Sequence, residues 1–369
     1  MFTSTLRSCC FSLTATLLWL FISGAITITH AQARAYVAES CNNTVDVIDT
    51  RTNTVIVKIP VGAFPHFLAV TPDATRVYVS NRQSNSVSVI DTATNTVIST
   101  IPIHFPSGIA ISPDSSRVYV TTSDSSIAVI DTSTNTVIDN IPDSFAPYQL
   151  ALTRDGTRLY VTHGVISFNN TVSVIDVASH QKIATIPVRA PAGIVLTPDN
   201  TRAYVAGREG GVFVIDTATN TVINFVAANI SLDVALTPNG ARGYLTNVFA
   251  FNVQVFDTTS NTIADDIPFD GFFAFLAVTS DGRRVYVTEN LNTSPPVGAV
   301  AVIETATNTI VDEITGLQCV NGIAIAPPQF PRSKDDCKEG GYQRFGPPEF
   351  RNQGQCLKYV KEHAVPNGP

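Results

Sequence analysis

The sequence predicts an all-β fold, a seven-bladed β-propeller of four-stranded blades, from two observations. An Arg two residues before a Tyr recurs seven times, at Arg34/Tyr36, Arg76/Tyr78, Arg117/Tyr119, Arg158/Tyr160, Arg202/Tyr204, Arg242/Tyr244 and Arg284/Tyr286. An acid closes the following strand in each copy, with a repeat of about 40 to 47 residues, at Asp49, Asp91, Asp131, Asp176, Asp216, Asp257 and Glu304. Short strands at this period, without a helical pattern, are typical of a propeller.

Residues 76–102 show three strands of one blade. The runs RVYVS, SVSVI and TVISTI are rich in β-branched residues, and the polar segments SNRQSN and DTATN between them predict turns. In the preceding segment TPDATR, a Pro fixes φ and an Asp can bond its own backbone, which predicts the turn between the first and second strands. Because the Arg, the Tyr and the acid recur in every blade, we interpret them as scaffold.

The order of strands predicts how the ring closes. Residues 34–60 supply three strands with no inner strand before them, whereas each later blade begins with one: FLAVT, GIAIS, QLALT, GIVLT, DVALT and FLAVT. A seventh such strand, GIAIA at Gly322 to Ala326, follows the last complete blade. We expect it to pair with Arg34 to Ser40, because closure removes two sheet edges that would otherwise be exposed.

The N-terminus predicts a secretory signal peptide. Arg7 precedes an uncharged apolar run from Phe11 to Thr29 and the small-residue segment Ala31-Gln32-Ala33. We expect cleavage after Ala33 and no membrane insertion afterwards. The alternative is an uncleaved anchor, because the run approaches the length of a bilayer span. The chain then divides into a signal peptide at 1–33, the propeller at 34–330 and a Cys-containing appendage at 331–369.

Charge and cysteine content narrow the class of protein further. The 369 residues carry a formal net charge of -7 and no basic run, which argues against nucleic acid as a partner. Four cysteines follow the signal, and export favours their pairing. Cys41 follows the second strand of blade 1 and Cys319 precedes the closing strand, so strand pairing predicts a Cys41–Cys319 bridge. Cys337 and Cys356 are left for one loop in the appendage.

The repeats resemble a known family. RVYVSN, RVYVTT and RLYVTH, followed by SVSVIDTATNTVI or AVIDTSTNTVI, are similar to the YVTN-type β-propeller repeat family, which is related to prokaryotic surface-layer proteins. The resemblance covers Arg34 to about Pro328 and implies a secreted or surface-attached module without an established reaction. Blade 4 departs from the pattern at Ser179-His180-Gln181, and blade 5 departs at Phe225-Val226.

Loop lengths indicate which face of the propeller varies. The distance from each acid to the next Tyr is 28 or 29 residues throughout. From each Tyr to its own acid it is 12 or 13 residues, except for 16 in blade 4 and 18 in blade 7. The variable segment is the turn between second and third strands, which shares a face with the blade-to-blade connections. Such variation on a rigid scaffold favours a binding face, with drift as the alternative.

The inner strands differ from one another just inside this face. One register reads His66, Ser107, Tyr148, Ala192, Leu232, Ala274 and Asn321, and the next reads Phe67, Gly108, Gln149, Gly193, Asp233, Phe275 and Gly322. With surrounding aromatic residues, they suggest a rim of exposed or half-exposed rings that would suit a ligand or partner. The candidate ligand-binding residues are His66, Phe67, His104, Phe105, Phe145, Tyr148, Gln149, His163, Arg189, Asp233, Phe272, Phe273 and Asn321.

Three of these candidates raise the question of a metal. His66, His104 and His163 map to the same face on adjacent blades, and imidazoles suit Zn or Cu. No short fixed ligand spacing supports a site, so we expect neither a metal nor a cofactor. We predict a monomeric, secreted or cell-surface binding module for an unknown protein, glycan or small-molecule ligand. The alternatives are a lactonase-like propeller hydrolase, with or without a metal held by His66, His104 or His163, and a structural envelope component.

Overall fold

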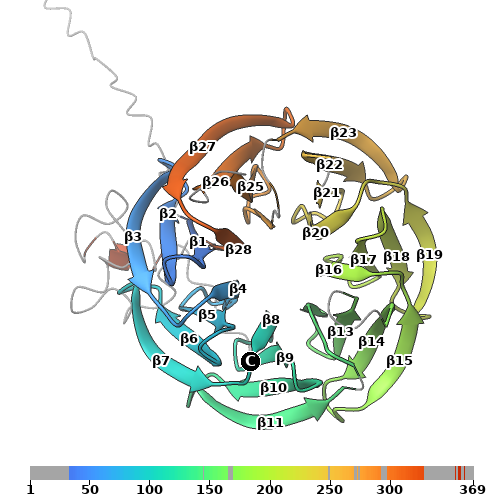
Figure 1. Ribbon diagram of the computed structural model, residues 1–369, viewed down its shortest axis with the longest axis horizontal. Coiled ribbons are helices and arrows are strands. Elements are labelled where there is room, and N and C mark those ends of the chain that lie inside the picture. The colour runs from blue at the N-terminus through green and yellow to red at the C-terminus, as the bar shows by residue number, and fades with distance from the viewer. Residues whose placement is uncertain are drawn as a thin grey trace, which may run out of the picture.

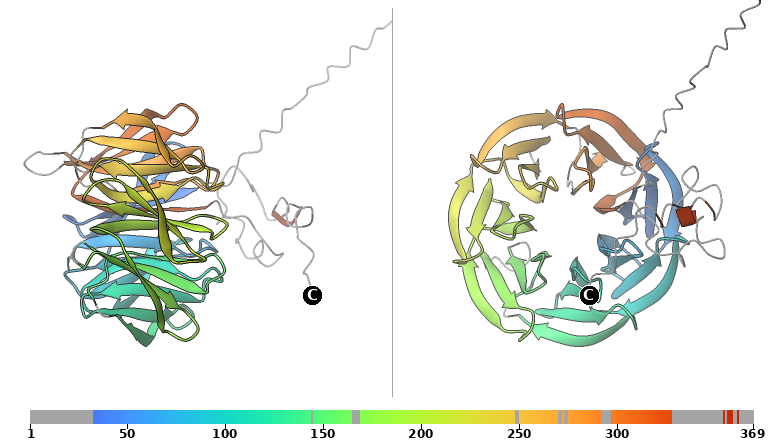
Figure 2. Two further views of the ribbon diagram at one scale, coloured as in Figure 1. Left: turned by 90° about the vertical axis from the view of Figure 1, so that its right-hand side faces the viewer. Right: turned by 180° about the vertical axis from the view of Figure 1, so that it is seen from behind.

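The propeller is present as predicted. The computed structural model describes residues 33–143, 145–164, 169–247, 250–269, 272, 275–291, 297–327, 354, 356–358 and 361. In this part of the chain, 28 strands form seven four-stranded antiparallel sheets that follow one another around a central axis (Figure 1). Turns gather at the two faces of the resulting disc (Figure 2). No helix in the described ranges has the length and apolar character needed to span a membrane.

Each blade contains four strands, which are ordered from the central axis to the outside of the ring. The innermost strands are β28 (Val320–Ala326), β4 (Pro65–Val70), β8 (Pro106–Ile111), β12 (Leu150–Leu152), β16 (Pro191–Leu196), β20 (Ser231–Leu236) and β24 (Leu276–Val278). The second strands are β1 (Arg34–Glu39), β5 (Arg76–Asn81), β9 (Arg117–Thr122), β13 (Arg158–His163), β17 (Arg202–Gly207), β21 (Arg242–Asn247) and β25 (Arg284–Leu291). The third strands are β2 (Thr44–Asp49), β6 (Ser86–Asp91), β10 (Ser126–Asp131), β14 (Thr171–Asp176), β18 (Val212–Asp216), β22 (Asn252–Asp257) and β26 (Val297–Glu304). The outermost strands are β3 (Thr54–Pro60), β7 (Thr96–Pro102), β11 (Thr136–Pro142), β15 (Lys182–Pro187), β19 (Thr221–Val226), β23 (Thr262–Pro268) and β27 (Thr309–Leu317).

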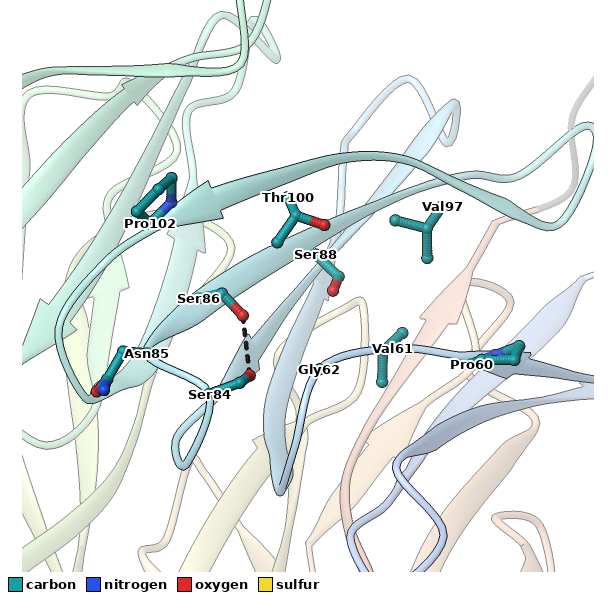
Figure 3. A pocket seen from close by; sticks show the side chains of 10 residues that line it. All are labelled: Pro60, Val61, Gly62, Ser84, Asn85, Ser86, Ser88, Val97, Thr100 and Pro102. Atoms are coloured by element: carbon teal, nitrogen blue, oxygen red, sulfur yellow. Dashed lines mark hydrogen bonds between the residues drawn. The ribbon is translucent and has the colours of Figure 1, made fainter.

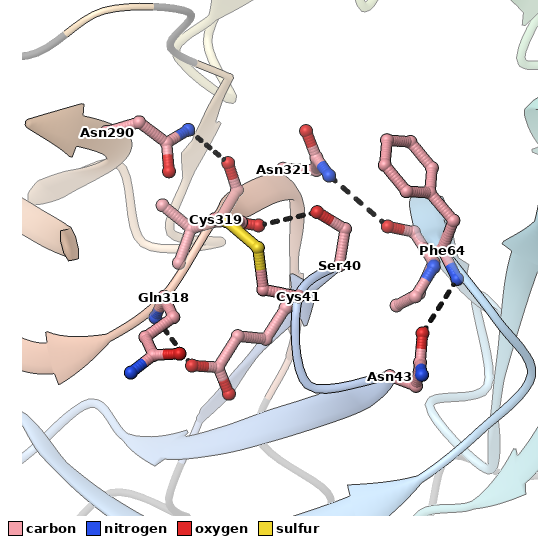
Figure 4. The surroundings of a disulfide bond; sticks show 11 residues. Ser40, Cys41, Asn43, Phe64, Asn290, Gln318, Cys319 and Asn321 are labelled. Atoms are coloured by element: carbon pink, nitrogen blue, oxygen red, sulfur yellow. Dashed lines mark hydrogen bonds between the residues drawn. A yellow bond between two sulfur atoms is a disulfide. The ribbon is translucent and has the colours of Figure 1, made fainter. Parts of the chain in front are cut away.

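The ring closes where the sequence predicts. Strand β28 pairs antiparallel with β1, with Arg34 opposite Ala326 and Val37 opposite Ile323. Cys41 and Cys319 form a disulfide beside this pairing, with their Cα atoms 5.5 Å apart (Figure 4). The Ser40 hydroxyl donates to the Cys319 carbonyl at 3.0 Å. The first and last strands are therefore held together by backbone, side-chain and covalent bonds.

The hydrophobic core lies between blades and repeats around the ring. One cluster combines Tyr36 and Val47 of blade 1 with Leu68, Val77 and Val79 of blade 2. Alternating strand residues place one set of side chains toward each neighbouring blade, and the repeated Tyr side chains are among the largest that are fully buried. Each blade therefore depends on both neighbours for burial of its apolar faces.

The repeated Arg and Tyr also bond the next blade, which confirms their structural role. The Tyr hydroxyl donates to an Asn side chain in the outer turn of the following blade, in the pairs Tyr36–Asn95, Tyr78–Asn135, Tyr160–Asn220, Tyr204–Asn261, Tyr244–Asn308 and Tyr286–Asn53. The matching Arg donates to a backbone carbonyl of the same turn, as Arg34 does to Thr92 at 2.7 Å. The Asp that opens this turn accepts backbone N–H groups, as Asp91 does from Ala93 and Thr94. These bonds tie every interface except one.

The exception is the interface between blades 3 and 4, where the repeat itself departs from the pattern. His180 occupies the Asn position, with φ of 57°, and its ring lies 2.7 Å from the Asp139 carboxylate. No hydrogen bond joins the Tyr119 hydroxyl to another described residue, and Arg117 bonds Asp131 of its own blade at 2.6 Å. The irregular sequence in blade 4 thus removes one inter-blade hydrogen bond.

Restoring the repeat at this position is expected to stabilise the protein. In His180→Asn, the side-chain oxygen of the new Asn would accept a hydrogen bond from the Tyr119 hydroxyl. This bond should add about 0.5–1.5 kcal/mol to the free energy of unfolding. Asn also tolerates the left-handed backbone well. An Asn there can also keep the Asp139 contact, since Asn53 and Asn308 donate to the equivalent Asp312 and Asp265. Urea unfolding should show a net increase in the free energy of unfolding, and adding Tyr119→Phe should abolish it. An equal gain with and without the Tyr119 hydroxyl would contradict the assignment.

The disulfide is expected to stabilise the closed ring. Its half-cystines are 278 residues apart, for which the chain-entropy model gives about 5 kcal/mol. The double variant Cys41→Ser/Cys319→Ser should unfold at lower urea concentration, by less than this maximum because β28 still pairs with β1. Peptide mapping without reductant should recover the two cysteines in one linked peptide. Free thiols at both positions would contradict the bridge.

Candidate functional site

The innermost strands line the central channel of the propeller. They surround a cavity near the variable-loop face of this channel. It has a volume of about 150 Å³ and is lined by Phe67, Leu68, Gly108, Ile109, Gln149, Leu150, Asp233, Phe275, Gly322 and Ile323. Six of these belong to the second register named above, so residues about 40 positions apart in the chain meet around one space. The closing strand β28 contributes Gly322 and Ile323, so the cavity wall is complete only in the closed ring.

Large and small side chains alternate around much of this ring. A Cβ at Gly193 would lie 2.6 Å from the Asp233 carboxylate, and one at Gly108 would lie 2.6 Å from the Tyr148 carbonyl. A Cβ at Gly322 would lie 2.6 Å from the His66 carbonyl. Each glycine therefore allows the neighbouring inner strand to approach closely. The space that remains is bounded by Phe67, Gln149, Asp233 and Phe275.

Asp233 supplies the one carboxylate that lines this cavity. Its Oδ2 accepts the Leu276 N–H of the next blade at 3.2 Å, and the Val234 N–H and the Gln149 side chain also bond to it. Gln149 in turn accepts the Ile194 N–H at 3.3 Å. These partners are neutral, and Asp233 is half-buried where it lines the cavity. The carboxylate is thus positioned by hydrogen bonds without being neutralised by a cation.

Burial controls the protonation of Asp233. Loss of solvent raises the pKa of its carboxyl to about 6, while the three hydrogen bonds act in the opposite direction and only partly compensate. Asp233 therefore changes charge in the range where most surface carboxylates are already ionised. Burial also raises the pKa of the Tyr148 hydroxyl, and the Asp233 charge adds to this effect.

His66 lies beside the cavity in an aromatic cluster. Its ring meets Phe67 edge-on at 4.4 Å and Phe275 at 5.8 Å between centroids. Burial, with the Arg82 charge as a smaller cause, lowers the pKa of His66 to about 3, so the imidazole is neutral at physiological pH. Its Nδ1 atom has no hydrogen-bond partner in the described structure. Phe67 also packs edge-on against Tyr148 at 5.5 Å, which completes the aromatic wall.

Arg82 is a residue of this region that the sequence candidates did not include. Its guanidinium lies 4.9 Å from the centroid of the exposed Phe105 ring, and burial lowers its pKa. Its charge acts on both His66 and Tyr148. Arg82 lies within SNRQSN, the blade 2 segment of the variable turn. The sequence feature that could have identified Arg82 is a basic residue in the turn between the second and third strands, where the blades differ.

The other sequence candidates lie at several separate places. His104 is exposed and pairs with Asp124 at 2.9 Å, Arg189 is exposed, and the Phe145 ring lies 5.9 Å from His163. Phe272 forms an isolated bridge with Asn290, and Asn321 donates to the Pro65 carbonyl at 3.3 Å.

Phe273 lies outside the described residues, as do residues 1–32 of the expected signal and Cys337. Cys356 is buried and disulfide-bonded.

One expectation from the sequence, the exposed aromatic rim, differs from the structure. Tyr148 and Phe67 are 4% and 8% exposed, because they pack into the core instead of forming an exposed rim, while Phe105 is 38% exposed. The three histidines do not converge: His163 is fully buried against Ser173 at 2.9 Å, whereas His104 lies on the surface. No group of three metal-ligating residues is found in the part of the chain that the structure describes.

Comparisons with known proteins agree with this fold. A family model described as YNCE-like beta-propeller matches residues 19–125. This chain is a β-propeller. Its structure is similar to Kuenenia stuttgartiensis hydrazine synthase, with 23% identity, a TM-score of 0.64, and coverage of 73% of this chain and 92% of that one. No curated protein matches the sequence.

Two further solved structures are similar to this β-propeller. A functionally unknown protein from Desulfotomaculum acetoxidans has a TM-score of 0.71 and 17% identity, with coverage of 80% of this chain and 99% of that one. The dihydro-heme d1 dehydrogenase NirN has a TM-score of 0.61 and 14% identity, with coverage of 79% and 74%. At these low identities, the structural similarity establishes a common fold only. Function must therefore be argued from the site itself.

The unusual protonation of Asp233 predicts a pH-dependent stability. Its pKa in the folded protein exceeds the ordinary value of 3.8, so between about pH 4 and pH 6 the folded state binds the proton more tightly than the unfolded chain. The free energy of unfolding of the wild type, relative to Asp233→Asn, should therefore fall by about 2–3 kcal/mol as pH rises through this window. Urea unfolding at pH 4, 5, 6 and 7 measures it.

Asp114 provides a control of opposite sign. Hydrogen bonds from Ser112 and Ser116 lower the pKa of its carboxyl to about 2. Relative to Asp114→Asn, the wild type should lose stability as pH falls below about 4. A constant difference between the wild type and Asp233→Asn from pH 4 to pH 7 would contradict the burial of an ionisable carboxyl in the cavity.

Proposed function

We propose that this protein is an exported binding module that holds a cationic group of a small ligand in the cavity at the mouth of its channel. The observation that carries the proposal is the Asp233 carboxylate, which faces the cavity with only neutral hydrogen-bond partners. A carboxylate in such surroundings is stabilised by an opposite charge nearby. A ligand ammonium would supply it.

The rest of the wall suits the same ligand chemistry. Phe67 and Phe275 present aromatic rings 5.1 Å apart to the cavity, and such rings attract cations through their faces. The charges of Arg82 and Arg208 act on the Tyr148 hydroxyl, and neither is among the causes that change the pKa of Asp233. A volume of about 150 Å³ is below the usual range for whole drug-sized ligands, so it fits a head group.

Export and the identity of the repeat family are part of the same proposal. The apolar N-terminal run and the Cys41–Cys319 disulfide support an oxidising compartment. The YVTN-type repeat pattern supports a secreted or surface-attached module, and the variable turns around the cavity mouth support recognition of a ligand or partner there. We favour a monomer, because the closed ring leaves no inner edge to be completed by a second copy.

A binding role agrees better with the geometry than the hydrolase alternative. The metal-assisted form of that alternative draws on His66, His104 or His163, and these three side chains lie in separate surroundings. No observation specifically favours a structural envelope component.

Calorimetric titration tests the proposal directly. We expect small amines such as choline and putrescine to bind the wild type at pH 7.5 at least tenfold more tightly than uncharged alcohols of similar size. Affinity should rise with pH through about 6, because Asp233 then ionises while the amine stays charged. Asp233→Asn should remove both the preference and the pH dependence.

The exposed residue His104 offers a matched control on the same face. His104→Ala should leave the titrations unchanged, because its ring bonds Asp124 away from the cavity lining. Equal affinity of the wild type and Asp233→Asn for every amine, or no binding of any amine, would refute the proposed ligand class.

A further inference from the structure

A second cavity lies on the flank of blade 2, away from the channel. We call it the blade 2 groove; it has a volume of about 530 Å³ and is lined by Pro60, Val61, Gly62, Ser84, Asn85, Ser86, Ser88, Val97, Thr100 and Pro102. Figure 3 shows Val61 and Val97 at one end, Asn85 and Pro102 at the other, and the serines between them. Its volume falls within the usual range for small-molecule sites.

The equivalent region of blade 4 shows why this groove is open. Ser173 pairs with Thr185 there as Ser88 pairs with Thr100 in blade 2, so the two strands present the same hydroxyl pair. In blade 4, however, Lys182 lies over this surface and forms an ion pair with buried Asp143 at 2.8 Å. The repeat places Val97 at the Lys182 position and Val61 at the Asp143 position. Blade 2 thus keeps the apolar residues that the repeat also has in blades 3 and 5, whereas blade 4 has an ion pair at these positions.

Three other blades fill the same region with their own side chains. In blade 1, Lys58 bonds Asp46 at 2.6 Å at the paired positions that Thr100 and Ser88 occupy in blade 2. In blade 5 these positions hold Phe225 and Phe213, with ring centroids 4.9 Å apart. In blade 6, Gln254 accepts the N–H of Asn229 from the preceding connection at 3.2 Å. The opening is therefore particular to blade 2 among these blades.

The floor of the groove has polar groups that are incompletely bonded. Asn81 is fully buried beneath it and donates from Nδ2 to Ser86 at 3.3 Å and to Ser88 at 2.9 Å. Its Oδ1 has no partner in the described structure, although buried polar atoms are normally bonded. Ser88 accepts from Asn81 and keeps its own proton to donate. The polar layer directly beneath the groove therefore keeps unused hydrogen-bonding capacity.

The lining selects for one class of ligand. It contains no charged side chain, so it offers no partner for an ionic group. Hydroxyl and amide groups in its centre match a molecule with many hydroxyls, and the apolar prolines and valines at its ends match C–H faces. At the rim, Asn85 accepts the N–H of Phe105, whose exposed ring extends the surface beyond the groove. We infer that the blade 2 groove binds a neutral carbohydrate.

The repeat itself supplies a variant that closes the groove. Val61→Asp/Val97→Lys would reproduce the Asp143–Lys182 pair that blade 4 already accommodates over the same hydroxyl pair. Ser88→Ala/Thr100→Val removes the two hydroxyls with little change in volume. Asp233→Asn serves as the control that alters only the channel cavity.

The test uses the labelled protein on an array of neutral oligosaccharides and their uronic-acid and sulfated counterparts. We expect the wild type and Asp233→Asn to be retained equally by at least one neutral oligosaccharide. Retention should fall at least tenfold in both groove variants, with thermal melting used to confirm folding. If the charged variant fails to fold, the hydroxyl variant decides the result. Retention on anionic sugars alone, no retention, or undiminished retention of a folded groove variant would overturn the inference.

Discussion

Closure of the ring by the pairing of β28 with β1 is the constraint on which the rest of the structure depends. Each blade is a twisted sheet whose two faces become apolar interfaces only when a blade lies on either side, so an open array would expose two such faces and two edges. The Tyr286–Asn53 bond makes the junction of blades 7 and 1 similar to the other interfaces, and the Cys41–Cys319 bridge ties the innermost strand of blade 1 to the turn between β1 and β2. The same closing strand brings Gly322 and Ile323 to the channel cavity. The cavity wall is therefore complete only when the ring is closed.

The two candidate sites occur where the blades differ from one another. A sevenfold scaffold supplies seven equivalent positions, and positions that keep the repeated Arg, Tyr and Asn are used for bonds between blades. At the cavity position the chain instead carries glycines, two phenylalanines, a glutamine and a single aspartate, so an asymmetric space arises on a symmetric frame. At the flank position, blade 2 carries valines where blade 4 carries an ion pair. Specific chemistry thus arises from differences between blades, while the inter-blade bonds preserve the frame.

Much of the fold could be predicted because its information is local and repeated. Alternating apolar strands, Pro and Asp turn signals and a constant period predict the blades, and the unpaired inner strand Gly322 to Ala326 predicts both the closure and the disulfide. The register of the inner strands even placed Phe67, Gln149, Asp233 and Phe275 at one level, where the structure shows a common cavity. Exposure was harder to predict, because it depends on how side chains from neighbouring blades pack. Tyr148 has the appearance of a rim residue in sequence and lies in the core, and Arg82 became relevant only through its position beside Phe105 and Tyr148.

The sequence by itself determined the number of blades, their strand order and the scaffold role of the repeated residues, since these follow from periodicity and short-range turn chemistry. Tertiary structure alone decided which side chains face a common space and which are separated. His66, His104 and His163 share a face in the repeat yet have three different environments, because a position along a strand does not fix whether a side chain meets a neighbouring blade, the channel or solvent. The charge on Asp233 depends in the same way on Gln149 and on the Leu276 N–H of β24, which are distant in sequence, because burial and hydrogen bonding are properties of the assembled ring.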